Sequence, residues 1–247
     1  MDFNLLDHSF CEMNIYGKAP EYINSISSLF LSLYGLFGLF IIKNTSSSKI
    51  NNIENIYTAL IINGICSFMY HFNNKIGWGL MDRFSMILIA IPCYTIAIDI
   101  LRLSEIKKKI FRIIITSYIT ILMTVTGLQH EILFNILFGI FLGSLFIFMC
   151  IIQFENNYYL IPKNIVNKGW LGVLYLLLAG TFWIITEKLC FKYSFIKYLF
   201  GHSFWHFGCA YGGYLITLIP TYFYNRDKFL KIEYYWNIPY IKIISDI

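Results

Sequence analysis

Charged residues are scarce in this chain of 247 residues, and their scarcity excludes most soluble proteins. Only 13% of the residues are charged, whereas 57% are hydrophobic and the mean hydropathy is +0.62. Soluble globular chains carry roughly 25% charged residues, so this chain lacks the polar surface that would cover a water-exposed globule. We therefore expect an integral, multi-pass membrane protein whose neighbours are membrane lipids.

Three further features are missing. The first 25 residues lack the basic start and the apolar core of a cleavable signal peptide, so the first membrane helix is expected to direct insertion. The net charge is +5, but no basic run is interleaved with aromatic residues, and we expect no nucleic-acid partner. The six cysteines form no C-x-x-C pair, and four of them lie inside apolar segments, where buried thiols are common.

Apolar runs that approach the length needed to cross a bilayer, about 20 residues, recur along the chain. They predict an all-α fold, an integral membrane bundle of seven transmembrane helices. This transmembrane domain covers residues 26–224, between an N-terminal segment (1–25) and a C-terminal tail (225–247). The predicted spans are Ile26–Ile42, Ile56–Phe72, Leu80–Leu101, Ile110–Gly127, Ile132–Phe154, Gly169–Leu189 and Ser203–Tyr224.

Basic residues are unequally distributed between the two sides of the predicted bundle. Thirteen of the 19 Lys and Arg residues fall on the side of the C terminus and the other six on the side of the N terminus. The excess of basic residues in cytosolic loops therefore places the N terminus on the non-cytosolic side and the C terminus in the cytosol. The sequon Asn44-Thr45-Ser46 is then cytosolic and is expected to carry no glycan. An endomembrane such as the endoplasmic reticulum or Golgi is the expected location.

Glycine pairs indicate where helices approach closely. Gly139 and Gly143 are four residues apart, and so are Gly208 and Gly212. Small residues at this spacing allow two membrane helices to pack at short distance. We predict close helix packing at both pairs.

Three of the five histidines converge on the non-cytosolic face of the predicted bundle. His71 lies near the end of the second span, and His202 and His206 open the seventh. Residues four apart share one face of a helix, so the three imidazoles can surround a single ion. Three imidazoles leave a fourth tetrahedral position open, which is the arrangement of catalytic zinc. The pattern predicts a zinc site.

Two other polar residues fall at the same face. Asp82 opens the third span, and its carboxylate can accept a proton and return it; capping of the helix N terminus is its alternative role. Ser67 lies one turn from His71, and its hydroxyl can stabilise a developing oxyanion. His8 and the pair His130-Glu131 also fall on this side. We interpret them as loop residues, with His130-Glu131 as an alternative ligand pair.

The order and spacing of these residues resemble the alkaline ceramidases, a branch of a seven-span hydrolase superfamily that includes the adiponectin and progestin receptors. The superfamily pattern is Ser-x-x-x-His, an Asp and a late His-x-x-x-His, and it reads here S-F-M-Y-H, Asp82 and H-S-F-W-H. Two segments favour the ceramidase branch. They are F-C-E-M-N followed by E-Y-I-N-S-I-S-S-L near the N terminus, and H-S-F-W-H-F-G-C-A-Y-G-G-Y in the seventh span.

The resemblance implies a zinc-dependent amidase that takes ceramide from the bilayer and hydrolyses it to a sphingoid base and a fatty acid. It implies that His71, His202 and His206 bind zinc, that Asp82 is the acid/base and that Ser67 is the oxyanion donor. It further implies a calcium ion close to the zinc, and calcium prefers six to eight oxygen ligands. The matching calcium positions are the carbonyl of Phe10 and the side chains of Glu12, Asn14 and Glu21.

The same resemblance implies a disulfide bond between Cys11 and Cys190, which match paired positions of the family. Two positions depart from the family pattern. Ser9 replaces an Asp in the calcium segment, which weakens the expected calcium site, and a polar cap of the first helix is the alternative reading of that segment. Thr186 replaces an Asp in the sixth span, which leaves the substrate less certain.

Three other functions are compatible with parts of the pattern. A receptor-like relative would keep zinc for structure, and another lipid hydrolase would cut an ester instead of an amide. A bundle that transports haem or metal ions is disfavoured, because the polar residues cluster at one face instead of lining a path across the membrane.

Overall fold

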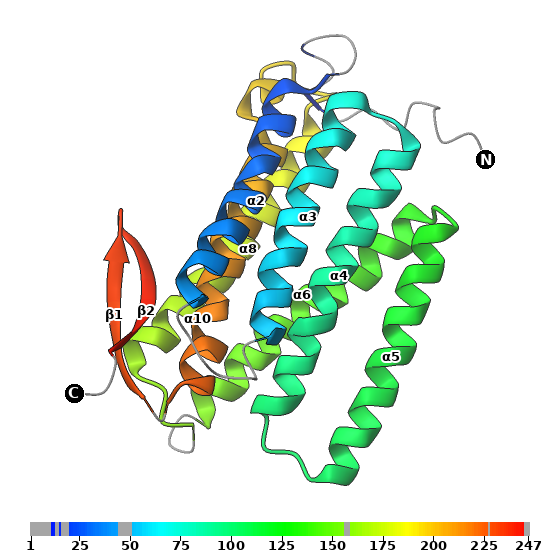
Figure 1. The fold of residues 1–247 in the computed structure, drawn as a ribbon. Coiled ribbons are helices and arrows are strands. Elements are labelled where there is room, and N and C mark those ends of the chain that lie inside the picture. Colours follow the sequence, from blue (N-terminus) through cyan, green and yellow to red (C-terminus); the bar gives the residue numbers. More distant parts are fainter. Residues whose placement is uncertain are drawn as a thin grey trace.

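The computed structural model describes residues 11–12, 15, 20–43, 51–155, 159–226 and 228–244, and in these residues the fold is a helical bundle (Figure 1). The last long helical segment is continuous from Gly201 to Tyr224 and consists of two α-helices joined by a π-helical turn, η3. The helices are α2 (Tyr22–Ile42), α3 (Asn51–Asn73), α4 (Ile76–Ile100), α5 (Glu105–Gly127), α6 (Glu131–Phe154), α8 (Lys163–Leu189), the short η2 (Ile196–Leu199), α9 (Gly201–Phe207), η3 (Gly208–Gly212) and α10 (Gly213–Tyr224).

Five helices of the described part are long and apolar enough to cross a membrane, namely α2, α4, α5, α6 and α8. Each contains a predicted span or overlaps it closely. These helices begin one to six residues before the predicted span, because polar residues such as Glu105 and Lys163 continue the helix beyond the apolar run. The helical fold and the membrane character are therefore confirmed.

The two remaining predicted spans correspond to α3 and to the divided last helix. Helix α3 is less apolar because it carries several asparagines as well as His71. The last helix is divided by η3, so neither α9 nor α10 reaches 18 residues. The count of seven spans and the side of each terminus stay predictions.

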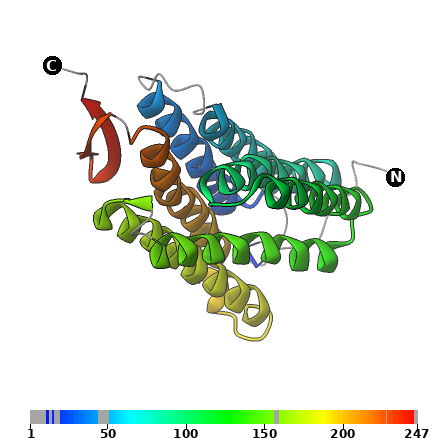
Figure 2. The same cartoon turned by 90° about the horizontal axis from the view of Figure 1, so that it is seen from below.

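Consecutive helices pack against one another around the bundle, and the last helix closes it by packing against both α2 and α8 (Figures 1 and 2). Gly212 makes this closure possible, since a Cβ there would lie 2.6 Å from the carbonyl oxygen of Gly172 in α8. The prediction of close packing is thus confirmed for Gly208 and Gly212. It is wrong for Gly139 and Gly143, because a Cβ at either position would meet no atom of the described residues within 4 Å.

The C-terminal tail contains structure that the sequence analysis does not predict. Strands β1 (Phe229–Tyr235) and β2 (Ile238–Ile244) form an antiparallel hairpin. Trp236 and Asn237 form its two-residue turn, with φ angles of 48° and 66°, as hairpin turns of this length require. The helical bundle therefore carries one small β element beside α10 and α2 (Figure 1).

Candidate metal centre

The three predicted zinc ligands form one buried cluster. His71 lies in the last turn of α3, and His202 and His206 lie one turn apart on α9. Their candidate ligand atoms all lie within 4.8 Å of one another, and each side chain is buried. A tetrahedral zinc ion with Zn–N bonds of 2.0–2.1 Å requires nitrogens about 3.4 Å apart. The geometry and the donor chemistry of the cluster therefore fit a single zinc ion.

Glu21, the residue before α2, holds His71 in place by two contacts. Its backbone N–H donates to the carbonyl oxygen of His71 at 3.0 Å, and its carboxylate Oε2 lies 2.6 Å from Nδ1 of the same histidine. A carboxylate at Nδ1 fixes the tautomer and leaves Nε2 for a metal ion. The resemblance implies a calcium role alone for Glu21, and the structure adds this contact with a zinc-site histidine.

Buried serines of α2, which are not among the residues predicted for the site, contact the third histidine. The Ser27 hydroxyl lies 2.8 Å from Nδ1 of His206, and Ser28 lies 3.4 Å from the same nitrogen. Ser28 also donates to the hydroxyl of Ser67 at 3.1 Å. The signal was present in the sequence, because polar residues on one face of an apolar helix must find buried partners.

Asn24 connects α2 to α9 beside the metal ligands. Its Oδ1 accepts a hydrogen bond from Ser203, the residue after His202, at 2.9 Å. Its Nδ2 donates to Glu21 Oε2 at 3.1 Å. One polar face of α2 thus orients residues of α3 and α9 together.

Asp82 lies near the start of α4, and its carboxylate is held by a neighbouring helix. Nδ2 of Asn63 in α3 donates to Asp82 Oδ1 at 3.1 Å and to Ser85 Oγ at 2.8 Å. Ser67 and Asp82 line the same cavity as His202 and His206. The structure therefore brings the predicted acid/base and the predicted oxyanion donor to the wall of the cavity that reaches the metal cluster.

This cavity has a volume of about 1290 Å³, larger than the roughly 300–1,000 Å³ of most small-molecule pockets. Its wall away from the histidines is mainly apolar. Side chains that form it include Met86 and Ile89 of α4, Ile115 of α5, Phe138 and Phe141 of α6 and Leu176 of α8. Such a space suits a long apolar ligand with one polar end near the histidines.

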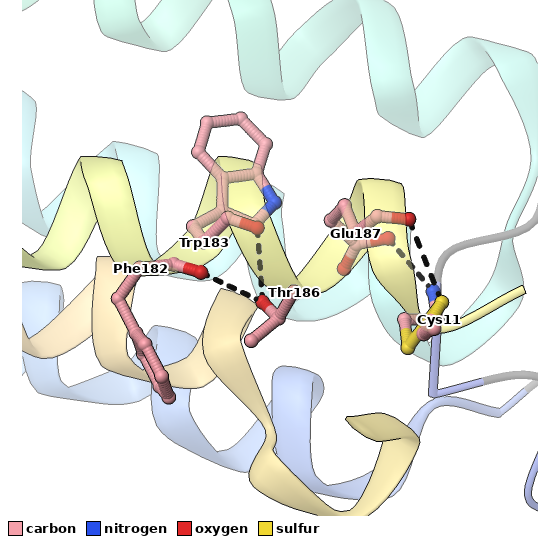
Figure 3. The surroundings of a disulfide bond; sticks show 6 residues. Cys11, Phe182, Trp183, Thr186 and Glu187 are labelled. Carbon is pink, nitrogen blue, oxygen red and sulfur yellow. Dashed lines mark hydrogen bonds between the residues drawn. A yellow bond between two sulfur atoms is a disulfide. The ribbon is translucent and has the colours of Figure 1, made fainter. Parts of the chain in front are cut away.

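A disulfide bond joins Cys11 to Cys190, with Cα atoms 6.0 Å apart, as the resemblance implied (Figure 3). Glu187 strengthens this connection, because its Oε2 accepts a hydrogen bond from the backbone N–H of Cys11 at 2.9 Å. The N-terminal segment is therefore fastened to the end of α8, close to α9.

Thr186, where the family pattern has an Asp, is buried in α8. Its hydroxyl donates to the carbonyl oxygens of Phe182 and Trp183 in the same helix, at 2.9 Å each (Figure 3). It packs against Gly201, the first residue of α9, where any Cβ would collide with the Thr186 side chain. Thr186 therefore shapes the contact between α8 and the helix of the two histidines.

Of the four predicted calcium positions, Glu12 and Glu21 lie in the described part, whereas Phe10 and Asn14 lie outside it. Both oxygens of Glu12 accept backbone N–H groups at the start of α2, from Ile23 at 2.7 Å and Asn24 at 2.8 Å. Burial raises the pKa of the Glu12 carboxyl above its ordinary value, the two N–H donors lower it, and the nearby Glu21 carboxylate raises it. The capping role that was the alternative for this segment is thus observed.

His130, the one other histidine in the part of the chain that the structure describes, does not join the cluster of three histidines. His130 is the N-cap of α6, where its Nδ1 accepts from the N–H of Leu133 at 3.4 Å. This agrees with its interpretation as a loop residue. His8, Ser9 and the Asn44 sequon lie outside the described residues.

Comparison with known proteins gives one result at the level of families. A family model described as ceramidase matches residues 7–242, which is nearly the whole chain and includes all five residues of the predicted catalytic set. No individual curated protein matches the chain significantly. The extent of the family match is sufficient to classify the chain, which belongs to the ceramidase family.

Proposed function

We propose that this protein is a zinc-dependent amidase that hydrolyses ceramide to a sphingoid base and a free fatty acid. The observation that carries the proposal is the buried cluster of His71, His202 and His206, two of which line a large, mainly apolar cavity. The family match supports the amide substrate, because ceramidases are hydrolases of this bond.

The cavity suits ceramide for a physical reason. Ceramide has two long apolar chains and one small polar head that contains the amide, so it stays in the bilayer. The apolar wall between α4, α5, α6 and α8 can receive the chains, while the polar groups at the histidine end face the amide. Burial of the chains would offset the cost of moving the amide to the site.

A zinc ion held by the three imidazoles would supply Lewis acidity at the amide carbonyl. Asp82 takes a proton from the attacking water and returns it to the nitrogen of the leaving sphingoid base. The N–H group of Asn63 holds the Asp82 carboxylate in position for both transfers. The proton balance closes, because the water that adds to the carbonyl supplies the proton that the amine carries away.

Ser67 stabilises the oxyanion that forms on the carbonyl oxygen. The hydroxyl of Ser28, 3.1 Å from that of Ser67, holds Ser67 at the cavity wall, beside Asp82. Preorganised donors of this kind accelerate acyl transfer since they match charge that develops only in the transition state.

Calcium is a second part of the proposal, with Phe10, Glu12, Asn14 and Glu21 as ligands. The support is electrostatic. Glu12 and Glu21 are both buried, and the Glu21 carboxylate disfavours the ionised form of Glu12, a penalty that a divalent cation removes. Because Glu21 also contacts His71, a cation at this position would lie close to the zinc site.

We also propose the topology inferred from the sequence: seven spans, an N terminus outside the cytosol, a C terminus in the cytosol and an endomembrane location. The disulfide bond supports this side for the N terminus, because disulfides persist in oxidising compartments.

The function is tested with purified protein in lipid vesicles, by measuring fatty acid and sphingoid base released from ceramide, with and without calcium. Diacylglycerol, which has ester bonds, is the matched substrate. We expect release from ceramide by the wild type and none by His202→Ala. Release from diacylglycerol alone would identify a lipid esterase, and no release from either lipid by zinc-loaded protein would favour a receptor-like role; each result contradicts the proposal.

A further inference from the structure

The C-terminal hairpin carries charged residues in the middle of its strands and aromatic residues at its tip. In the middle, Glu233 accepts a hydrogen bond from Lys242 at 3.2 Å and lies 3.9 Å from Lys231. At the tip, Tyr234, Tyr235 and Trp236 are consecutive and exposed, and Trp236 is 87% exposed. Exposed aromatic clusters of this kind mark interaction surfaces.

The hairpin packs against the bundle, so the exposed aromatic residues at its tip have a defined position. Ile241 is only 3% exposed and belongs to the main hydrophobic core, together with the partly buried Ile232. The hydroxyl of Tyr214 in α10 donates to the carbonyl oxygen of Pro239 at 2.8 Å. These contacts hold the inner face of the hairpin against α10 and turn the aromatic tip to the surroundings.

Two contacts define the level of the tip along the bundle. The ring of Tyr235 lies 6.1 Å from that of Phe37, which is five residues before the end of α2 at Ile42. The amine of Lys168 lies 5.6 Å from the ring of Tyr234, and Lys168 is five residues after the start of α8 at Lys163. At 1.5 Å per residue, Phe37 and Lys168 lie about 7.5 Å inside the ends of their helices, and Tyr234 and Tyr235 contact the bundle at these residues.

Lys168 directly precedes the apolar run of α8, which begins at Gly169, so this level corresponds to the border between the hydrocarbon core and the interfacial layer of a bilayer that surrounds the bundle. The hydrocarbon core is about 30 Å thick and the whole bilayer about 40–45 Å, so each interfacial layer is about 5–7 Å thick. Tyr and Trp prefer this layer, because one part of each ring is apolar and another part forms hydrogen bonds. A two-stranded hairpin has unpaired backbone groups at both edges, which disfavours deeper insertion into hydrocarbon.

We propose that the hairpin is an interfacial membrane anchor, in which Tyr234, Tyr235 and Trp236 insert among the lipid headgroups of the leaflet on the C-terminal side. Lys168, beside Tyr234, adds a positive charge that attracts anionic phosphate groups. The occupant of this surface is the same bilayer that holds the helices. The proposal does not depend on the enzymatic activity.

The test uses the full chain in vesicles and the fluorescence of Trp236. The Trp236 signal is the difference between the wild type and Trp236→Phe, a surface substitution that leaves the inner face of the hairpin intact. The probes are phosphatidylcholines brominated near the glycerol or near the chain ends, unbrominated vesicles being the control, and iodide as an aqueous quencher. Circular dichroism and thermal unfolding of both proteins check the fold.

We expect loss of most of the Trp236 signal with lipid brominated near the glycerol, a smaller loss with lipid brominated near the chain ends, and little effect of iodide. Quenching by iodide without quenching by lipid would mean a tip in water. Protection from all quenchers would mean a tip covered by protein, such as a second copy of the chain. Either result overturns the proposal.

Discussion

The hydroxyl of Ser27 lies 2.8 Å from Nδ1 of His206, so a serine of α2 orients a candidate zinc ligand on α9. A hydrogen bond at Nδ1 fixes the imidazole tautomer and directs Nε2 at the metal. The contact joins residues 179 positions apart in the chain.

Replacement of Ser27 by alanine is predicted to weaken zinc binding and to lower kcat/KM by about 10–100-fold, the usual cost of losing a partner of a metal-bound histidine. Zinc affinity is measured by competition with a chelator. Ser32→Ala is the matched control, since Ser32 is a buried serine of the same helix that donates to the carbonyl of Ile61 instead. Equal zinc affinities of the two variants would disprove the role of Ser27.

Asp82→Asn is predicted to lower kcat by about 10²–10⁴-fold, the typical contribution of a general acid/base. Zinc content should stay at the wild-type level, because the carboxylate moves protons and is not a ligand. The measurement combines ceramide turnover with elemental analysis of the same preparation. A variant with full turnover would remove Asp82 from the mechanism, and one without zinc would give it a structural role.

Loss of the Cys11–Cys190 bond is predicted to destabilise the protein by about 2–4 kcal/mol, because the bond joins two segments separated by 179 residues. Thermal unfolding of Cys190→Ser is compared with that of Cys150→Ser, which removes an unpaired cysteine. Mass spectrometry without reduction should find the linked peptide in the wild type. A free thiol at Cys11 there would contradict the structure.

Gly172→Ala is predicted to destabilise the bundle by about 1–3 kcal/mol, the usual cost of overpacking, since its Cβ would lie 2.5 Å from the carbonyl oxygen of Gly212. Gly139→Ala is the matched control, because a Cβ there meets nothing within 4 Å in the described part of the chain. Alanine favours helix over glycine by about 1 kcal/mol, so this control should be neutral or slightly stabilising. Similar unfolding temperatures of the two variants would refute the assigned helix contact.

Residue spacing was enough to predict the helices and the histidine cluster. Apolar length defines a membrane helix, and the four-residue separation of His202 and His206 places both on one face. His71 joined them because the order of spans alone brings the end of the second span to the face where the seventh begins. The same rule failed at Gly139 and Gly143, because spacing shows that a small residue can pack but does not show that a neighbouring helix is present.

The partners of the histidines could not be predicted from spacing. Ser27 and Glu21 reach His206 and His71 across tertiary contacts, and their pattern is equally that of a polar helix start. The hairpin was missed for a different reason. Its strands are short and follow the last span, and the turn at Trp236-Asn237 lacks the Asn-Gly or Asp-Gly pair that marks a two-residue hairpin.

The most direct test of the whole account is the zinc content of the purified wild type compared with His71→Ala and His202→Ala, measured by mass spectrometry of the elements after dialysis against a weak chelator. We expect one zinc ion per wild-type chain and almost none in either variant, with helical content retained in all three proteins. A wild type without zinc, or variants that keep it, would contradict the claim that these imidazoles from α3 and α9 hold a single metal ion.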